Sequence, residues 1–182
     1  MTRQPRPIGP RGARAWCAIG LVVLLPAVRL PEVTQTDAGD ASLRELPGVA
    51  VVAEQVSSDV RHYGLDEAWI EKRVTSALGR DSIPLMTRSA ALTNDHQPLL
   101  VARLQSVRLP GRETFAWHLS LVVHQKVIAP GRSAAAMLAT TWEATASIGI
   151  TSGSMLKSSV GKTLDDQSAQ FVEAWRMRAR EE

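Results

Sequence analysis

Cysteine is almost absent from this sequence of 182 residues, and that absence sets a first limit on its chemistry. Cys17 is the only cysteine, and it lies in an apolar stretch near the N-terminus. The rest of the chain therefore has no internal disulfide and no cysteine-bound metal. A domain without thiols cannot mispair them, so its composition is compatible with an oxidising compartment.

Acidic residues are missing from the first thirty positions, which instead contain Arg3, Arg6, Arg11, Arg14 and Arg29. Setting these five aside leaves 16 of the 21 basic residues against 18 acidic ones, a net charge of −2. The basic pI of about 9.5 thus belongs to the N-terminus rather than to the rest of the chain. Because proteins that follow phosphates carry clustered basic residues, we expect no nucleic-acid partner.

The sequence also lacks an apolar run long enough for a comfortable transmembrane helix, which needs about 20 residues. Residues 15–28 form a shorter apolar run of about fourteen residues, directly after a region with four arginines. This layout predicts that residues 1–30 are a signal peptide or a retained N-terminal anchor, with a core helix as the alternative. The protein would then be periplasmic or part of the cell envelope, with membrane contact only through an uncleaved leader. Residues 31–46 are rich in Pro, Thr, Asp and Gly, which predicts a linker.

Residues 47–182 are predicted to form a single α+β domain. Strands are expected at 48–56, 83–86, 99–107, 115–127 and 138–150. Asp66 is a suitable N-cap for a first helix that Gly79 would end, and Thr163 is a suitable start for a second. The order β-α-β-β-β-β-α predicts a mainly antiparallel, four- to five-stranded sheet with two helices packed on one face. Four tryptophans, Trp69, Trp117, Trp142 and Trp175, fall on its predicted buried faces.

No motif predicts a catalytic centre or a cofactor site. Residues 160–163 (Val-Gly-Lys-Thr) end like a phosphate-binding loop, but Leu156 stands where that loop needs a glycine. Gly161 is therefore expected in a turn, and the carboxylates of Asp165 and Asp166 at a helix N-terminus. No serine lies in a Gly-x-Ser-x-Gly setting. We expect no metal either, because His118 and His124 would share a strand face about 20 Å apart.

One predicted surface remains for binding, the polar face of the sheet. Its candidate binding residues are Arg103, Gln105, His118, His124 and Glu143, with Ser120, Thr141 and Thr145 beside them. Such side chains can recognise a peptide, a glycan or a protein partner by directed hydrogen bonds. The alternative is an ordinary solvated face.

Residues 46–178 resemble a class of uncharacterised exported bacterial envelope proteins. The likeness rests on Leu46–Val52, on Gly64-Leu65 before an amphipathic helix, and on Phe171-Val172 in the closing helix. The element order is also similar to that of the LPS-assembly lipoprotein and of the N-terminal domain of the Tol–Pal translocation protein. The resemblance implies a non-enzymatic envelope domain that binds or assembles other components. The alternatives are an envelope hydrolase with an unrecognised active site, and a structural subunit that self-associates through a sheet edge.

Overall fold

Five strands and four helices make up the part of the chain that the structure, a computed structural model, describes: residues 42–44, 46–128 and 136–177. All of them belong to residues 34–182, one of the two compact units into which the chain divides. The predicted leader, residues 1–30, lies outside the described residues. In chain order the elements are β1 (Ala50–Ala53), α2 (Ser58–Arg61), α3 (Glu67–Arg80), α4 (Arg88–Thr93), β2 (Leu99–Arg108), β3 (Thr114–Ile128), β4 (Ala136–Glu143), β5 (Ser147–Ser152) and α5 (Gly153–Met177).

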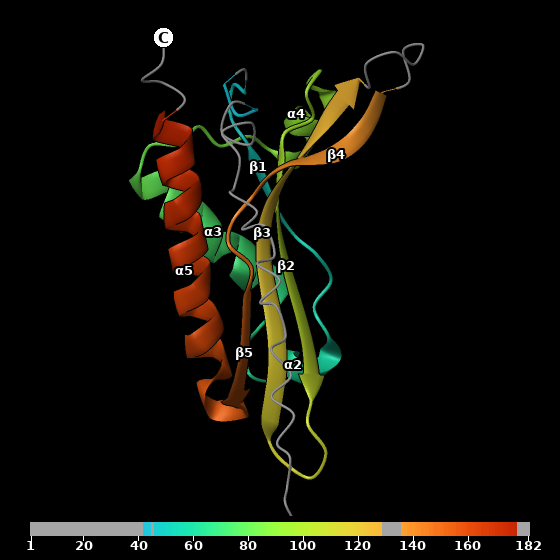
Figure 1. Ribbon diagram of the computed structural model, residues 1–182, viewed down its shortest axis with the longest axis vertical. Helices are drawn as coiled ribbons and strands as arrows, with labels where there is room; N and C mark the ends of the chain where they lie inside the picture. The colour runs from blue at the N-terminus through green and yellow to red at the C-terminus, as the bar shows by residue number, and fades with distance from the viewer. Residues whose placement is uncertain (1–41, 45, 129–135, 178–182) are drawn as a thin grey trace, which may run out of the picture. The chain divides into compact units, whose positions relative to one another are not determined.

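The sheet has five strands and is mixed, because one of its four strand pairs is parallel, whereas the sequence predicted a mainly antiparallel sheet without identifying that pair. β1 runs parallel to β2, with α3 in the connection between them, and all other pairs are antiparallel. β3 is the central strand, since β2 lies along one side of it while β4 and β5 share the other. β4 pairs with residues 122–128 of β3 and β5 with residues 114–119, as Figure 1 shows. The α+β class holds, and the parallel pair follows from the crossover through α3.

The two long helices, α3 and α5, pack against each other and on one face of the sheet (Figure 1). α3 contacts β1, while α5 contacts β3 and β5. The described residues also include the short helices α2 and α4, which were not predicted, so there are four helices rather than two. The predicted strand at 83–86 is a single bridge between Leu85 and Val49, because the chain turns into α4 two residues later.

The limits of the long helices differ from the prediction at two ends, the C-terminus of α3 and the N-terminus of α5. Asp66 is the N-cap of α3, as predicted, and its carboxylate accepts a hydrogen bond from the Trp69 N–H at 2.7 Å. Gly79, however, lies inside the last turn. α5 begins at Gly153 rather than Thr163, so the predicted turn at Gly161 is wrong. A Cβ on Gly161 would lie 3.0 Å from the Arg73 guanidinium carbon, so this glycine makes room for the Arg73 side chain, whose Nε donates to the Gly161 carbonyl.

The predicted strand at 138–150 is broken into β4 and β5 by residues 144–146. Gln167 of α5 reaches into this break, and its Nε2 donates to the carbonyls of Leu119 and Thr145, both at 3.0 Å. Ala144 lies opposite Leu121 of β3, and Ser147 lies opposite Leu119. Three residue steps from Ala144 to Ser147 therefore match only two steps along β3, so the break contains one extra residue. An extra residue reverses which face the following side chains take.

The core lies between the sheet and the two long helices. Trp117, Trp142 and Trp175 are buried there as predicted, whereas Trp69 is only half-buried and packs against the margin of this core. Leu43 and Leu46, which fall in the predicted linker, are also buried in this core. The domain therefore begins before residue 47, because these two leucines contribute to its apolar packing.

Candidate binding surface

The five predicted site residues lie on the sheet face opposite the two long helices, here called the open face. Strand register gives this result, because directly paired residues point to the same side. Gln105 is paired with His118, and Arg103 with Ser120. His124 is paired with Leu99 and with Thr140 of β4. Glu143 is paired with Val122.

Arg103 forms a two-pronged ion pair with Glu54, at the end of β1. Its Nε and Nη2 donate to the two carboxylate oxygens at 2.7 and 2.6 Å. These hydrogen bonds lower the pKa of Glu54 and raise the pKa of Arg103 further, while partial desolvation opposes both shifts. Both side chains keep more than a third of their surface in solvent, so the pair orients Arg103 more than it stabilises the fold.

Arg103, His124 and Glu143 form a charged cluster with Glu54, in which His124 acts on Glu54 and Glu143 acts on Arg103. The charge of His124 contributes to the lowered pKa of Glu54, and the charge of Glu143 contributes to the raised pKa of Arg103. Sequence reasoning missed Glu54, which it placed only in a predicted strand. The alternation along the predicted strand indicates which face Glu54 takes. Placing Glu54 beside Arg103 also requires knowing that β1 lies next to β2 and parallel to it.

His118 and Gln105 lie apart from this cluster, next to exposed aliphatic side chains. Ile148 of β5 is paired with His118, and Ile150 with Ala116, whose other neighbour is Val107. The exposed fractions of Ile148, Ile150 and Val107 are 82%, 70% and 66%. Simple alternation over the predicted strand at 138–150 places Ile148 on the same buried face as Trp142, and this prediction is wrong because the extra residue at 144–146 reverses the alternation.

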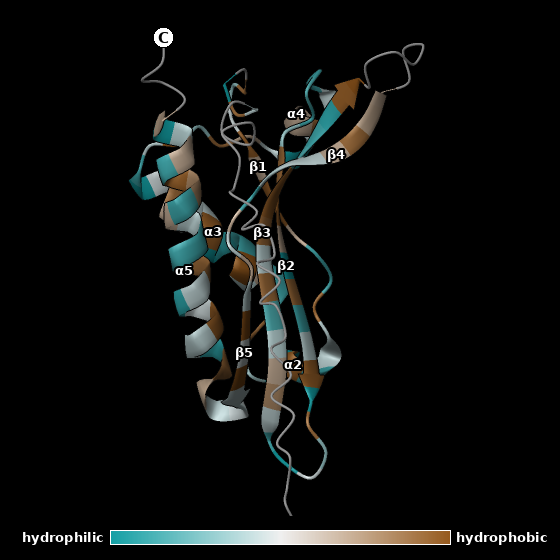
Figure 2. Cartoon of the chain, viewed as in Figure 1, coloured by the Kyte–Doolittle hydropathy of each residue, from teal (hydrophilic) through white to brown (hydrophobic). Residues whose placement is uncertain are grey.

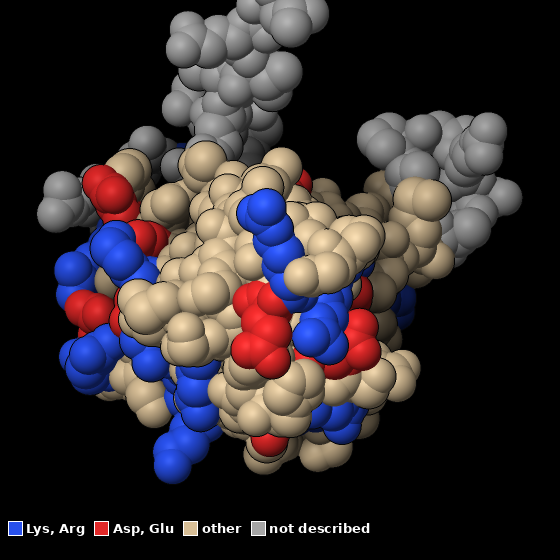
Figure 3. Space-filling view, turned by 90° about the horizontal axis from the view of Figure 1, so that it is seen from below, with Lys and Arg blue, Asp and Glu red and all other residues tan. Residues whose placement is uncertain are grey.

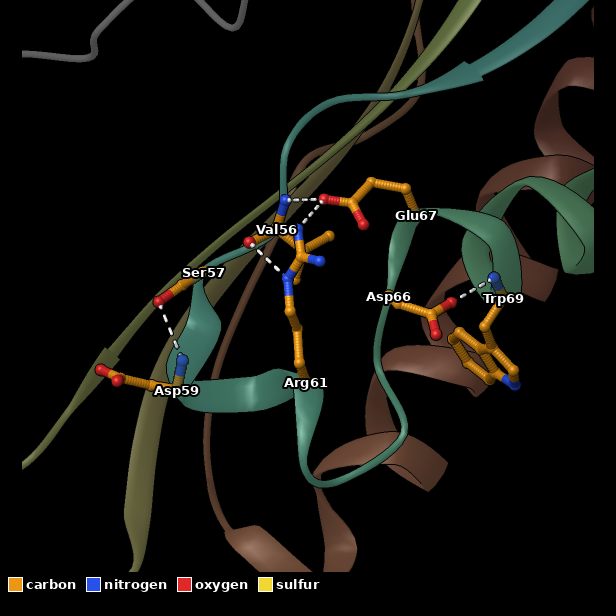
Figure 4. A network of polar contacts seen from close by, with 7 residues as sticks. All are labelled: Val56, Ser57, Asp59, Arg61, Asp66, Glu67 and Trp69. Atoms are coloured by element: carbon orange, nitrogen blue, oxygen red, sulfur yellow. Dashed lines mark hydrogen bonds and ion pairs between the residues drawn. The ribbon is translucent and has the colours of Figure 1, made fainter.

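A hollow of about 840 Å³ adjoins the open face where Gln105 lies. Besides Gln105, its lining includes the polar side chains of Ser57, Ser58, Arg61 and Ser106. Arg61 is held in place there, since its Nη2 donates to Glu67 at 2.6 Å and its Nε to the Val56 carbonyl (Figure 4). The hollow thus offers hydroxyl, amide and guanidinium groups to a polar ligand.

A second hollow, of about 490 Å³, lies between α3 and α5. Arg73 and Lys157 lie over the Trp69 ring, at 5.4 and 5.1 Å from its centre. Arg73 also donates to Asp165, at 3.1 and 2.7 Å. Asp165 is therefore an ion-pair partner in the middle of α5, rather than a charge at a helix N-terminus as predicted. These contacts connect the two helices.

Within the described part of the chain, no group of His, Cys, Asp and Glu side chains could hold a metal ion. No helix among the same residues is long and apolar enough to cross a membrane. Figure 3 shows basic and acidic side chains interspersed on the face seen from below. No known protein family matches this sequence, and no curated protein matches it either.

Proposed function

We propose that this protein is an exported, envelope-associated domain that binds a partner without catalysing a reaction. The open face would be the binding surface. The observation that carries the proposal is the pair of solvent-exposed isoleucines, Ile148 and Ile150, on the same face as the charged cluster around Glu54. Export is proposed from the arginine-rich start and the apolar run of residues 15–28.

The chemistry of the open face favours a protein or peptide partner. Interfaces commonly combine an apolar centre with a polar surround, and exposed apolar patches bordered by polar residues mark interaction sites. Val107, Ile148 and Ile150 supply the apolar part, while Arg103 and Glu143 supply charges of both signs. A glycan is the alternative partner, supported by the serine-lined hollow beside Gln105.

A triple variant, Arg103→Ala with His118→Ala and Glu143→Ala, tests the proposal. Substitutions at sites away from the core usually change stability by less than about 0.5 kcal/mol, so the variant should stay folded. We expect it to lose a partner that the wild-type chain recovers from envelope extract, while its melting temperature stays close to that of the wild type.

The matched control removes two exposed charges from the helix side, Lys72→Ala with Arg80→Ala. This control should recover the same partner as the wild type. If the triple variant keeps the partner and the control loses it, binding belongs to the helix layer and the proposal is wrong.

A further inference from the structure

The two edges of the sheet differ in how their backbone groups are satisfied. At the β1 edge, the Val49 N–H donates to the Pro84 carbonyl at 3.1 Å. The Ala53 N–H donates to the Glu71 carboxylate at 3.0 Å. Just beyond the strand, the Val56 N–H donates to Glu67 at 2.8 Å (Figure 4). Neighbouring segments thus occupy this edge and leave little room for another strand.

The β5 edge has no such cover among the residues that the structure describes, where β5 pairs only with β3. The Gly153 N–H donates to the Glu113 carbonyl, which fixes the alternation along the strand. Gly149 and Thr151 accordingly direct their backbone groups toward β3, and Ile148 and Ile150 direct theirs outward. The outward groups form a row that another strand can pair with.

The composition of this edge also favours pairing. Residues 136–152, which include β4 and β5, contain one charged residue, Glu143, and no proline. Natural sheets usually protect a free edge with charge, proline or a covering segment. Figure 2 shows brown, hydrophobic stretches along β5 and a paler end.

Gly149 gives β5 a further property that suits a partner strand. A Cβ at this position would lie 2.4 Å from the Trp117 ring, so the indole covers the helix-side face of the glycine. That face is therefore already occupied. What β5 leaves available is its outer edge and the two isoleucine side chains on the open face.

We propose that a second copy of this chain pairs with β5, strand against strand and antiparallel. The two-fold axis would pass between the two Gly149 residues and place Ile148 of each copy opposite Ile150 of the other. Ile-Gly-Ile is symmetric about its glycine, and the strand carries no charge, so like residues meet without repulsion. Each outward N–H and carbonyl of Ile148 and Ile150 gains a partner, and four isoleucines form one apolar ridge across the joined sheets.

The mass of the full chain in solution tests this proposal. We expect the wild type to have twice the mass of one chain, measured by light scattering or sedimentation. Ile148→Pro removes an outward N–H and leaves the hydrogen bonds to β3 intact, so it should be monomeric. Ile148→Thr keeps the N–H and the branched shape, and as the matched control it should remain a dimer with weaker association.

Amide hydrogen exchange of the wild type gives a second test, which does not depend on the proline variant folding. In a monomer, only the amides directed toward β3 are protected, so Ile148 and Ile150 exchange fast. In the proposed dimer, protection extends over consecutive residues from Ile148 to Thr151. A monomeric wild type, or a dimer with fast exchange at Ile148 and Ile150, overturns the proposal. The triple variant, whose three substitutions lie outside β5, tests partner binding by the open face separately.

Discussion

At the scale of single residues, Arg103 is the predicted site residue whose surroundings are best defined. Glu54 fixes two of its guanidinium nitrogens, so Arg103 presents a preset orientation rather than a freely moving charge. The ion pair also lowers the pKa of Glu54 below its ordinary value of 4.5. A partner that binds this cluster therefore meets an arginine and two carboxylates whose charges are already balanced in part.

The Glu54–Arg103 pair predicts a pH-dependent difference between the wild type and Glu54→Gln. Because the folded-state pKa of Glu54 is lowered, the charged pair stabilises the fold above the unfolded-state pKa. That contribution disappears as the pH falls through the lowered pKa. For this half-exposed pair we expect the wild type to be more stable by about 0.5 kcal/mol at pH 7 and by nearly nothing at about pH 2.

Denaturant midpoints at the two pH values measure this difference. Glu173→Gln is the matched control, since Glu173 is exposed and has no ion pair among the described residues. An equal gap at both pH values for Glu54→Gln would show that Arg103 does not hold Glu54 in its charged form.

At the scale of elements, Trp142 of β4 and Trp69 of α3 differ in how deeply they are buried. Trp142 is 5% exposed and meets Phe171 of α5 edge to face, with 5.1 Å between ring centres. Trp69 is only half-buried, with Arg73 of α3 and Lys157 of α5 over its ring. We expect Trp142→Ala to cost about 3–5 kcal/mol in unfolding free energy, as large aromatic truncations in a core do. Trp69→Ala should cost clearly less, and denaturant unfolding compares the two variants.

Equal denaturant midpoints for the wild type and Trp142→Ala would mean that β4 presents the opposite face to the core.

The long alternating strands and the Asp66 cap could be predicted because local patterns encode them. The alternation of Phe115, Trp117 and Leu119 identifies the buried face of β3 without any tertiary information. The break at residues 144–146 could not be predicted, since the partner of its Thr145 carbonyl is Gln167 of α5, 22 residues further along the chain. For the same reason the exposed position of Ile148 was missed. The parallel placement of β1, and with it Glu54, also depends on contacts that no local pattern contains.

At the scale of the whole molecule, the two layers of the described fold present different surfaces. The helix layer is connected by Arg73–Asp165 and covers the core. The open face presents the charged cluster, the exposed isoleucines and the hollow beside Gln105. This division leads to the central claim, that the sheet rather than the helices meets the partner.

Site-specific photo-crosslinking in living cells tests that claim most directly. A photoreactive amino acid replaces Gln105 on the open face or, as the control, Lys72 on the exposed side of α3. We predict that the Gln105 variant forms an adduct with a different envelope protein, whose mass is not that of two copies of this chain, and that the Lys72 variant forms none. An adduct from Lys72 with none from Gln105 would contradict the account.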